Sequence, residues 1–228
     1  AAPPPPPAPE HRFLLACAAA GPARRGPAEQ QAADHAAVAA AIPQMDYEFI
    51  IADLDEAGGK TVCEEIGAEF MSLDVSDPDA WEARIAEIEQ RHGALHVVHL
   101  NAGITTYKSD SGGLVEAFDL ASMPLANYRR IMGANVDGVI LGARACQRLM
   151  QASGGGCLIA TASVAGVVSF PPDPIYTATK HAVVGLSIAL AEDLRQAGSG
   201  SGGGRGQGVK RKRVRLCAAG TSWLFEIS

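Results

Sequence analysis

A serine, a tyrosine and a lysine in the second half of the chain have side chains and a spacing suited to proton transfer. Ser163 follows the apolar run "CLIATA", Tyr176 comes thirteen residues later, and Lys180 lies four residues beyond Tyr176. On a helix, Tyr176 and Lys180 share one face. A phenol has a reference pKa of about 10, and a nearby ammonium favours the phenolate, which brings that pKa toward the working range of an acid or base. The triplet therefore predicts that Tyr176 exchanges a proton with a substrate oxygen held by Ser163.

The spacing of Tyr176 and Lys180 also arises by chance in many helices, with the tyrosine packed and the lysine solvated. Other polar residues at the ends of expected strands favour the chemical interpretation. Asp53 closes one such strand, Asp74 follows the next, and "LNAG" at 100–103 follows a third. An acidic side chain in the position of Asp53 accepts hydrogen bonds from an adenosine ribose, and its charge repels the extra phosphate of NADP. A simple turn is the alternative for each strand end taken alone.

Strands and helices alternate along most of the chain. The apolar run from Phe13 to Ala20 is a candidate first strand, and the Ala-rich stretch after Gly26 is a candidate first helix. The clearer strands are expected at 47–53, 69–75, 95–103 and 156–163, and the helices at 56–68, 77–93, 121–153 and 175–197. This alternation predicts an α/β fold with a three-layer, doubly wound parallel sheet, Rossmann-like and incomplete at both ends. In such sheets ligands bind at the carboxyl ends of the strands.

The chain is expected to hold one domain, at residues 12–198. A Pro-rich tail at 1–11 is predicted to be disordered, because successive prolines remove hydrogen-bond donors. A Gly/Ser-rich linker is expected at 199–209, and residues 210–228 are expected to supply one last strand, within "VKRKRVRLCAAG", and a tail.

Composition and charge narrow the function classes. Of the 228 residues, 47% are hydrophobic and 19% charged, and the formal charge is −6, so we expect small-molecule partners or copies of the chain rather than nucleic acid. The basic run from Lys210 to Arg215 is interpreted as a solvated loop. Five scattered cysteines suggest neither disulfides nor a metal site, which favours a cytoplasmic protein. No apolar run reaches the roughly 20 residues of a membrane helix, and "FLLACAAAG" is only a weak match to a secretion signal.

Six short motifs in order resemble the short-chain dehydrogenase/reductase family over about residues 47–198: "ADLD", "LDVSD", "LNAG", "NVDG", "TASVAG" and "YTATK". The resemblance implies that Tyr176 is the catalytic acid/base and that Lys180 binds the nicotinamide ribose and lowers the pKa of Tyr176. It also implies that Ser163 orients the substrate carbonyl and that Asn135 supports a proton relay through water.

The same resemblance implies a cofactor site along the strand ends. It assigns Asp53 to the adenosine ribose, Asp74 and Val75 to the adenine, and Asn101 and Ala102 to the central region of the cofactor. The implied reaction is hydride transfer between NAD and a secondary alcohol or ketone, without a metal.

Two departures from the family pattern leave a second interpretation open. The Thr-Gly-x-x-x-Gly-x-Gly motif of the family has no clear counterpart here, since Gly21 and Gly26 are one residue too far apart and Pro27 takes the region of the third glycine. We hypothesise that "RFLLACAAAG" replaces the first strand, with phosphate binding weakened. Because little sequence follows "RVRLCAAG", we also expect the substrate lid of the family to be absent. The alternative function is therefore a catalytically impaired or non-catalytic relative, or a misassembled gene product, acting through protein contacts.

The two expected helices at 121–153 and 175–197 carry apolar residues around much of their circumference. One face of each can cover the sheet, and the surplus predicts a second contact surface. We therefore expect a homo-oligomer formed through these two helices, which the family resemblance also implies. An additional contact within the chain is the alternative.

Overall fold

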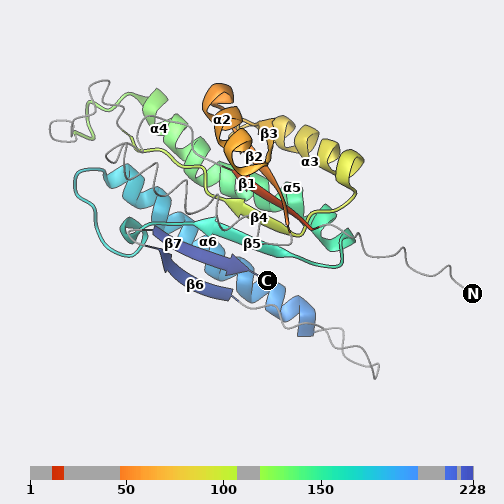
Figure 1. Ribbon diagram of the computed structural model, residues 1–228. Coiled ribbons are helices and arrows are strands. Elements are labelled where there is room, and N and C mark those ends of the chain that lie inside the picture. The colour runs from red at the N-terminus through yellow and green to blue at the C-terminus, as the bar shows by residue number, and fades with distance from the viewer. Residues whose placement is uncertain (1–11, 18–46, 107–118, 200–213, 220–221, 228) are drawn as a thin grey trace, which may run out of the picture.

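The computed structural model describes residues 12–17, 47–106, 119–199, 214–219 and 222–227 of the 228 residues. The described strands form one seven-stranded sheet in the order β3-β2-β1-β4-β5-β7-β6 (Figure 1). The first five strands are mutually parallel where they pair, and they are β1 (Phe13–Cys17), β2 (Glu48–Asp53), β3 (Glu69–Ser72), β4 (Val97–Leu100) and β5 (Cys157–Thr161). This part of the sheet confirms the Rossmann-like prediction.

The central strand β1 pairs in parallel with β2 on one side and β4 on the other. The hypothesis that "RFLLACAAAG" supplies the first strand is therefore confirmed for Phe13–Cys17. Apolar side chains explain the central position, since Leu15 and Cys17 are almost fully buried. The Ala-rich stretch expected as the first helix and the candidate glycine loop lie outside the described residues.

The last two strands correct the expected end of the sheet. β6 (Val214–Ala219) and β7 (Ser222–Ile227) form an antiparallel pair, and β7 also runs antiparallel to β5. The predicted last strand, in "RVRLCAAG", thus lies at the edge of the sheet, and the segment expected as a tail supplies the strand beside β5. Only two residues separate β6 from β7 in the sequence, and such a short connection can join antiparallel strands but not parallel ones.

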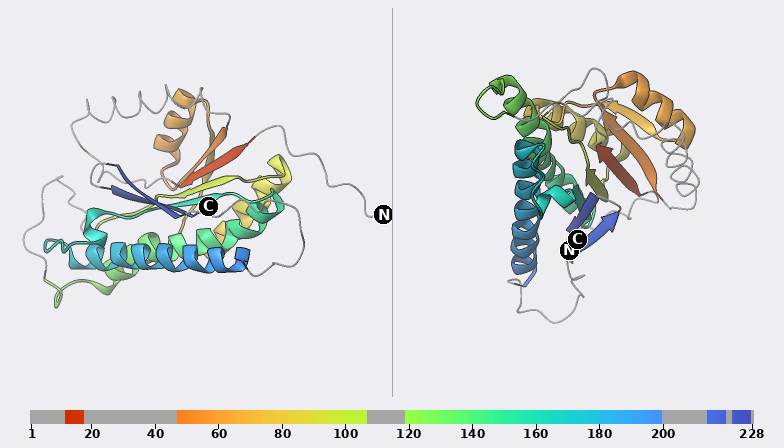
Figure 2. Two further views of the ribbon diagram at one scale, coloured as in Figure 1. Left: turned by 90° about the horizontal axis from the view of Figure 1, so that it is seen from below. Right: turned by 90° about the vertical axis from the view of Figure 1, so that its left-hand side faces the viewer.

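Helices cover both faces of the sheet, which gives the three predicted layers (Figure 2). α2 (Glu56–Ile66) lies on one face, where Gly59 packs against the ring of Phe70. α3 (Pro78–His92), α5 (Gly138–Ala152) and α6 (Pro174–Ser199) lie on the other. On that face Gly142 of α5 packs directly against Leu100 and Trp81.

The expected helix at 121–153 begins later and is not uniform. It consists of α4 (Leu125–Met132), a π-helical segment (Gly133–Asp137) and α5, which ends at Ala152. The π-helical segment inserts a wider turn, a feature that often lies at functional sites. The helix expected at 175–197 is α6, which continues to Ser199 and so includes the first residue of the predicted linker. The rest of that linker and the tail at 1–11 lie outside the described residues.

Capping residues set the bounds of α3. Asp77 accepts hydrogen bonds from Asp79 N (2.9 Å) and Ala80 N (3.3 Å), Pro78 occupies the first turn, and Gly93 ends the helix at a φ of 72°. A left-handed φ of this kind favours glycine.

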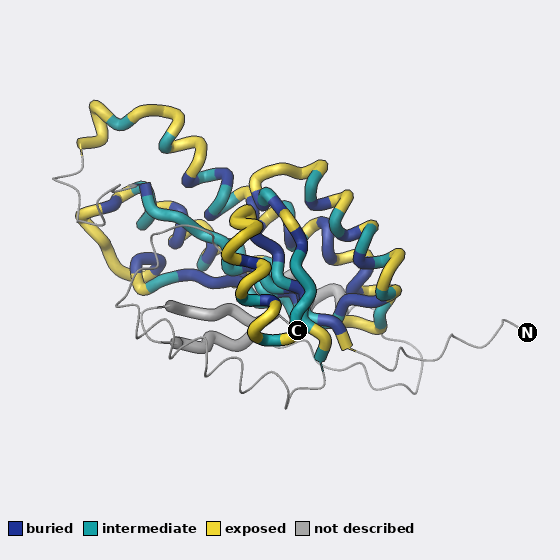
Figure 3. The backbone as a smooth tube through the Cα atoms, turned by 45° about the horizontal axis from the view of Figure 1, so that its top comes forward, coloured by how far each residue is buried: buried dark blue, intermediate teal, exposed yellow. Residues whose placement is uncertain are grey.

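The core lies between the sheet and the α3, α5 and α6 layer. Figure 3 shows the burial following the strands and the inward sides of these helices, with exposed residues on their outer sides. Trp81 is the largest fully buried side chain among the residues whose burial is described, and its indole Nε1 donates to Val75 O over 2.9 Å, which satisfies its polar atom. No described helix is both long enough and apolar enough to cross a membrane.

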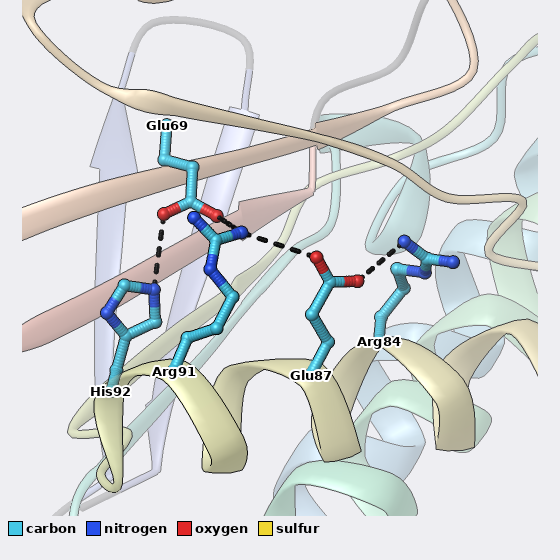
Figure 4. Close-up of polar contacts among 5 residues, drawn as sticks. All are labelled: Glu69, Arg84, Glu87, Arg91 and His92. Carbon is cyan, nitrogen blue, oxygen red and sulfur yellow. Dashed lines mark hydrogen bonds and ion pairs between the residues drawn. The ribbon is translucent and has the colours of Figure 1, made fainter.

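At the amino ends of the strands, a chain of ion pairs joins α3 to β3 (Figure 4). Glu69 contacts Arg91 and also His92, whose Nε2 lies 3.2 Å from Glu69 Oε2. Arg91 also pairs with Glu87 (3.3 Å), which pairs with Arg84 (2.7 Å). Because these groups are partly exposed, each pair contributes little stability.

Candidate functional site

The predicted polar residues lie at the carboxyl ends of the parallel strands. Asp53 is the last residue of β2, Asn101 follows β4, and Ser163 follows β5 by two positions. Parallel strands place their carboxyl ends along one edge of a sheet, so these residues share that edge. α6 begins there too, at Pro174, and carries Tyr176 in its first turn.

Lys180 lies one helical turn beyond Tyr176 and is 4% exposed. Its Nζ donates a hydrogen bond to Thr161 O at the end of β5 (3.0 Å) and lies 5.7 Å from the centroid of the Tyr176 ring. The alternative of a solvated lysine is therefore wrong. The ammonium is held between the end of the sheet and the phenol ring, where burial strengthens its electrostatic effect.

Ser163 is half-buried and caps a short 3-10 helix (Val164–Gly166) with extended backbone angles. Its Oγ accepts a hydrogen bond from Ala165 N over 3.2 Å. The 3-10 helix packs directly on α6, since a Cβ added to Gly166 would lie 2.8 Å from Lys180 O. A glycine at this position thus lets the segment carrying Ser163 approach the helix that carries the tyrosine and the lysine.

Asn135 lies in the π-helical segment and is fully buried. Its Oδ1 accepts from Ile104 N (2.7 Å), and its Nδ2 donates to Ile104 O (2.9 Å) and to Thr179 Oγ1 (3.0 Å). The Thr179 hydroxyl in turn donates to Tyr176 O (2.7 Å). Asn135 therefore connects the chain after β4 to the first turns of α6, and both of its amide hydrogens are used in doing so.

The "LNAG" segment approaches the same residues closely. A Cβ added to Gly103 would lie 3.2 Å from Lys180 Nζ and 3.4 Å from Asn135 Oδ1. The absence of a side chain at Gly103 leaves room for these two polar groups to face the backbone. Asn135 and Lys180 are thus brought together around residues 101–104.

The residues expected to bind the adenosine end lie farther along the strand ends. Asp53 is 6% exposed, and its Oδ1 accepts from Asp55 N (2.9 Å). Asp74 is half-buried and accepts from Ser76 N (2.9 Å) and Ser76 Oγ (2.7 Å), which is the geometry of a local turn. Val75 and Ala102 pack around a small apolar gap together with Cys17, Leu100 and Ala134, and this gap has no room for a water molecule.

Cys17 lies close to Val75, Ala102 and Asp53, but it is not a reactive thiol. Burial, and second the charge of Asp53, raise the pKa of Cys17 to about 12. Burial likewise raises the pKa of Cys146 well above its usual value. Both thiols therefore stay protonated at neutral pH, and a thiolate is the form that acts as a nucleophile.

Several buried residues beside this site are absent from the sequence prediction, among them Asp173 and Thr106. Asp173 caps α6 by accepting from Tyr176 N (2.9 Å), and it also binds Thr106. An Asp followed by Pro just before an apolar-periodic segment is a helix-start signal, so Asp173 could have been found as a cap. Its partner 67 residues away has no local signal.

A cavity of about 350 Å³ lies at the opposite ends of the strands, lined by Phe13, Glu48, Phe49 and Glu69 among others. The carboxylate of Glu69 is already paired with the arginine and histidine drawn in Figure 4. The grouping of a phenol, a buried ammonium and a hydroxyl occurs at the carboxyl ends instead. Within the described part of the chain, no group of three or more His, Cys, Asp or Glu residues could hold a metal ion.

Comparison with known proteins agrees with this arrangement. Residues 35–199 match a protein-family model described as enoyl-(acyl carrier protein) reductase. The chain is 36% identical over 149 residues to 3beta-hydroxysteroid dehydrogenase of Mediterraneibacter gnavus, covering 65% of this chain and 48% of that protein. It is 35% identical over 180 residues to trans-4-hydroxycyclohexanecarboxylate dehydrogenase of Sinomonas cyclohexanicum, covering 74% of this chain and 64% of that protein.

A solved structure of a short-chain dehydrogenase/reductase from Burkholderia phymatum in complex with NAD is also similar. Its TM-score is 0.64 and its sequence identity 25%, over 83% of this chain and 62% of that one. The chain thus spans about half to two thirds of the length of these relatives. Because the family model matches well over half of the chain and the named relatives and solved structures agree with it, the chain belongs to the short-chain dehydrogenase/reductase family.

Proposed function

We propose that the chain forms the cofactor-binding and catalytic part of an NAD-dependent oxidoreductase that transfers a hydride between the nicotinamide and a secondary alcohol or ketone. The observation that carries the proposal is the position of Lys180, buried at the end of β5 with its ammonium 5.7 Å from the Tyr176 ring centroid. Burying an ammonium costs free energy, and its hydrogen bond to Thr161 O offsets part of that cost. In this position the ammonium also favours the phenolate form of Tyr176.

In the proposed mechanism, Tyr176 moves the proton and the other residues hold the reacting oxygen. During oxidation, the phenolate oxygen takes the hydroxyl proton of the alcohol, and during reduction the phenol returns it to the ketone oxygen. The Ser163 hydroxyl donates a hydrogen bond to the same oxygen, since its own Oγ already accepts from Ala165 N. Lys180, fixed by its bond to Thr161 O, stabilises the phenolate. When bound, the nicotinamide supplies or accepts the hydride.

The described residues fit a dinucleotide at the carboxyl ends of the strands. The carboxylate of Asp53 at the end of β2 is suited to a ribose hydroxyl and opposes a phosphate in that place, which favours NAD over NADP. Val75 and Ala102, which follow β3 and β4, are proposed to lie beside the adenine and the central region of the cofactor, respectively. Gly103 carries no side chain and lies close to Lys180, which leaves room beside the backbone after β4 for the central region of the cofactor. Asn101, two residues earlier, is proposed to contact the same region.

The surroundings of Ser163 favour an apolar substrate. Four large apolar side chains after this serine are exposed: Val164, Val167, Val168 and Phe170. They belong to the segment that joins the serine to the tyrosine, and we propose that they offer an apolar surface to the substrate. The relatives are named for acting on hydroxysteroids and on a hydroxycyclohexane, both of which carry a ring alcohol. We propose a substrate of the same class, an alicyclic secondary alcohol or the matching ketone.

A titration followed by an activity assay tests the proposal. Fluorescence of NADH and NADPH is measured with increasing protein. NAD reduction is then followed by absorbance with trans-4-hydroxycyclohexanecarboxylate and with a 3-hydroxysteroid. Saturable NADH binding in the micromolar range, weaker NADPH binding and turnover of either alcohol support the function. No binding at millimolar cofactor would favour the alternative of a non-catalytic relative instead.

Replacement of Tyr176 by Phe isolates the acid/base step. The variant retains the ring beside Lys180 but loses the oxygen that exchanges the proton. Turnover should therefore fall below about one thousandth of the wild-type value while NADH binding stays the same. Undiminished turnover would refute the role of Tyr176.

The assembly and the compartment are proposals as well. Ile140 on α5 and Ile188 on α6 are 44% and 54% exposed, which supports contact between copies through these helices. The four described cysteines are free, which supports a reducing, cytoplasmic environment.

A further inference from the structure

We propose that Asp173 is a positioning residue that fixes Tyr176 against the segment following β4 through a buried carboxylate. The proposal rests on the proposed function, because it concerns the geometry of the proposed acid/base. Asp173 and its partner Thr106 are 2% and 1% exposed, and they come from different segments, Asp173 just before α6 and Thr106 after β4.

The Asp173 carboxylate accepts three hydrogen bonds. Oδ2 accepts from Thr106 N (2.8 Å), and Oδ1 accepts from Thr106 Oγ1 (2.6 Å) and from Tyr176 N (2.9 Å). A buried carboxylate is costly unless several donors compensate its charge, and three donors meet that requirement here. One carboxylate therefore joins the first turn of α6 to a chain segment 67 residues away.

This arrangement exceeds what a helix cap requires. Asp77, the cap of α3, is exposed and accepts only from backbone N–H groups of its own helix, at Asp79 and Ala80. A cap needs one such acceptor. Asp173 Oδ1 is the acceptor that Tyr176 N needs, and it also accepts from Thr106 Oγ1. Oδ2 accepts from Thr106 N. The additional bonds serve the connection between the two segments.

The connection closes around Tyr176 from both sides. The Tyr176 N–H is held by Asp173, and the Tyr176 carbonyl is held by the Thr179 hydroxyl, which is bonded to Asn135. Asn135 binds both backbone groups of Ile104, and Asp173 binds Thr106 two residues later. The backbone of the tyrosine is thus tied at its N–H and its carbonyl to the same short segment, 104–106. Since a misplacement of about 1 Å can cost about 100-fold in rate, this double attachment matters for catalysis.

The chemistry of the contact makes Asp173→Asn and Asp173→Ser informative substitutions. An asparagine has the same shape, but its amide nitrogen would face a donor, either Thr106 N or Tyr176 N. A serine retains a good helix cap for Tyr176 N and is too short to reach Thr106. Asp77→Ser is the matched control, because it makes the same exchange at a cap with no long-range partner.

The test uses the full chain, with NAD and trans-4-hydroxycyclohexanecarboxylate or whichever 3-hydroxysteroid is turned over. In D173S and D173N, kcat should fall at least about tenfold while KM and the Kd of NADH stay within about twofold of wild type. D77S should keep all three within about twofold. Thr106→Val should lower kcat by a smaller factor than D173S. The double variant D173S/T106V should have the same kcat as D173S, because both substitutions break the same contact between Asp173 and Thr106. A general loss of folding would instead change the binding constants and the unfolding midpoint together.

Two outcomes would overturn the proposal. The first is unchanged kcat in D173S; if a variant at 173 fails to fold, unchanged kcat in T106V takes its place. The second is independent of catalysis: amide hydrogen exchange at Thr106 should accelerate in D173S and not in D77S, and equal protection in both would show that no such connection exists. Failure of the proposed function is distinguishable, because the wild-type chain would then bind no NADH and turn over no alcohol, while the exchange experiment would still decide whether Asp173 holds Thr106.

Discussion

Substitution of Asn135 by alanine removes the side chain that joins the segment after β4 to α6. In the wild-type chain Asn135 is fully buried and makes three hydrogen bonds, two to the backbone of Ile104 and one to Thr179. After the substitution, Ile104 N and Ile104 O both lose their partner. Thr179 keeps its bond to Tyr176 O, so it is not left without one.

The expected loss of stability follows from the two backbone groups. Each polar group left unsatisfied in a buried setting costs about 1–3 kcal/mol, and Ile104 is half-buried, so about 2–4 kcal/mol in total is expected. Domains unfold with about 5–15 kcal/mol, which makes this a large fraction. With a urea m value of about 2 kcal/mol/M for a chain of this size, the unfolding midpoint should fall by about 1–2 M.

Urea unfolding followed by circular dichroism measures this shift directly. The matched control is Asn127→Ala on α4, which removes the same side-chain atoms at a half-buried position and should change the free energy of unfolding by less than about 0.5 kcal/mol. If N135A unfolds within about 0.5 kcal/mol of wild type, the two Ile104 contacts contribute nothing and the description of Asn135 as a bridge is wrong.

Three further outcomes are expected. Gly142→Ala should lower the free energy of unfolding by about 1–3 kcal/mol, because the added Cβ would lie 2.6 Å from a Leu100 methyl carbon and 2.7 Å from the Trp81 ring. Gly185→Ala, at an exposed position of α6 with no atom within 4 Å of the added Cβ, should raise it by about 0.5–1 kcal/mol. Urea unfolding midpoints that move in the same direction in both variants would contradict this. The pKa of the Cys17 thiol is raised from 9.0 to about 12 in the folded chain, so the unfolded chain loses this proton at a lower pH. The free energy of unfolding should therefore decline as pH rises from 9 to 12. Urea unfolding across that range should show a smaller decline in Cys17→Ala than in wild type. Ile140→Asp combined with Ile188→Asp should lower the mass measured by light scattering to that of a monomer, and a wild-type chain that is already monomeric would refute contact through α5 and α6.

The parallel part of the fold could be predicted because its signals are local. β2, β3, β4 and β5 each lie within the stretches expected from short apolar runs, and α3 lies within the stretch bounded by Asp77 and Gly93. The β6–β7 pair could not be placed in the same way. Its position beside β5 depends on pairing between residues more than 60 positions apart, such as Thr161 with Leu224, which no local pattern encodes.

The chemistry of the site was more predictable than its geometry. The types and spacing of Ser163, Tyr176 and Lys180 suggested proton transfer, and the burial of Lys180 agrees with that interpretation. The π-helical turn that carries Asn135 leaves no clear sequence signal. The partnership of Asp173 with Thr106 likewise arises only when the fold brings the two segments together.

Small residues explain how the site becomes narrow enough for these contacts. At Gly103 and at Gly166, an added Cβ would lie 3.2 Å from Lys180 Nζ and 2.8 Å from Lys180 O, respectively. The lysine thus has backbone without a side chain close to its ammonium at Gly103 and close to its own carbonyl at Gly166, while the ammonium donates to Thr161 O. A chain with Tyr176 and Lys180 at the same spacing but alanine at 166 would push the segment bearing Ser163 away from α6, because a helix backbone cannot yield as a flexible side chain can. The ability of the triplet to act together thus depends on the glycines that flank it as much as on the three reactive side chains.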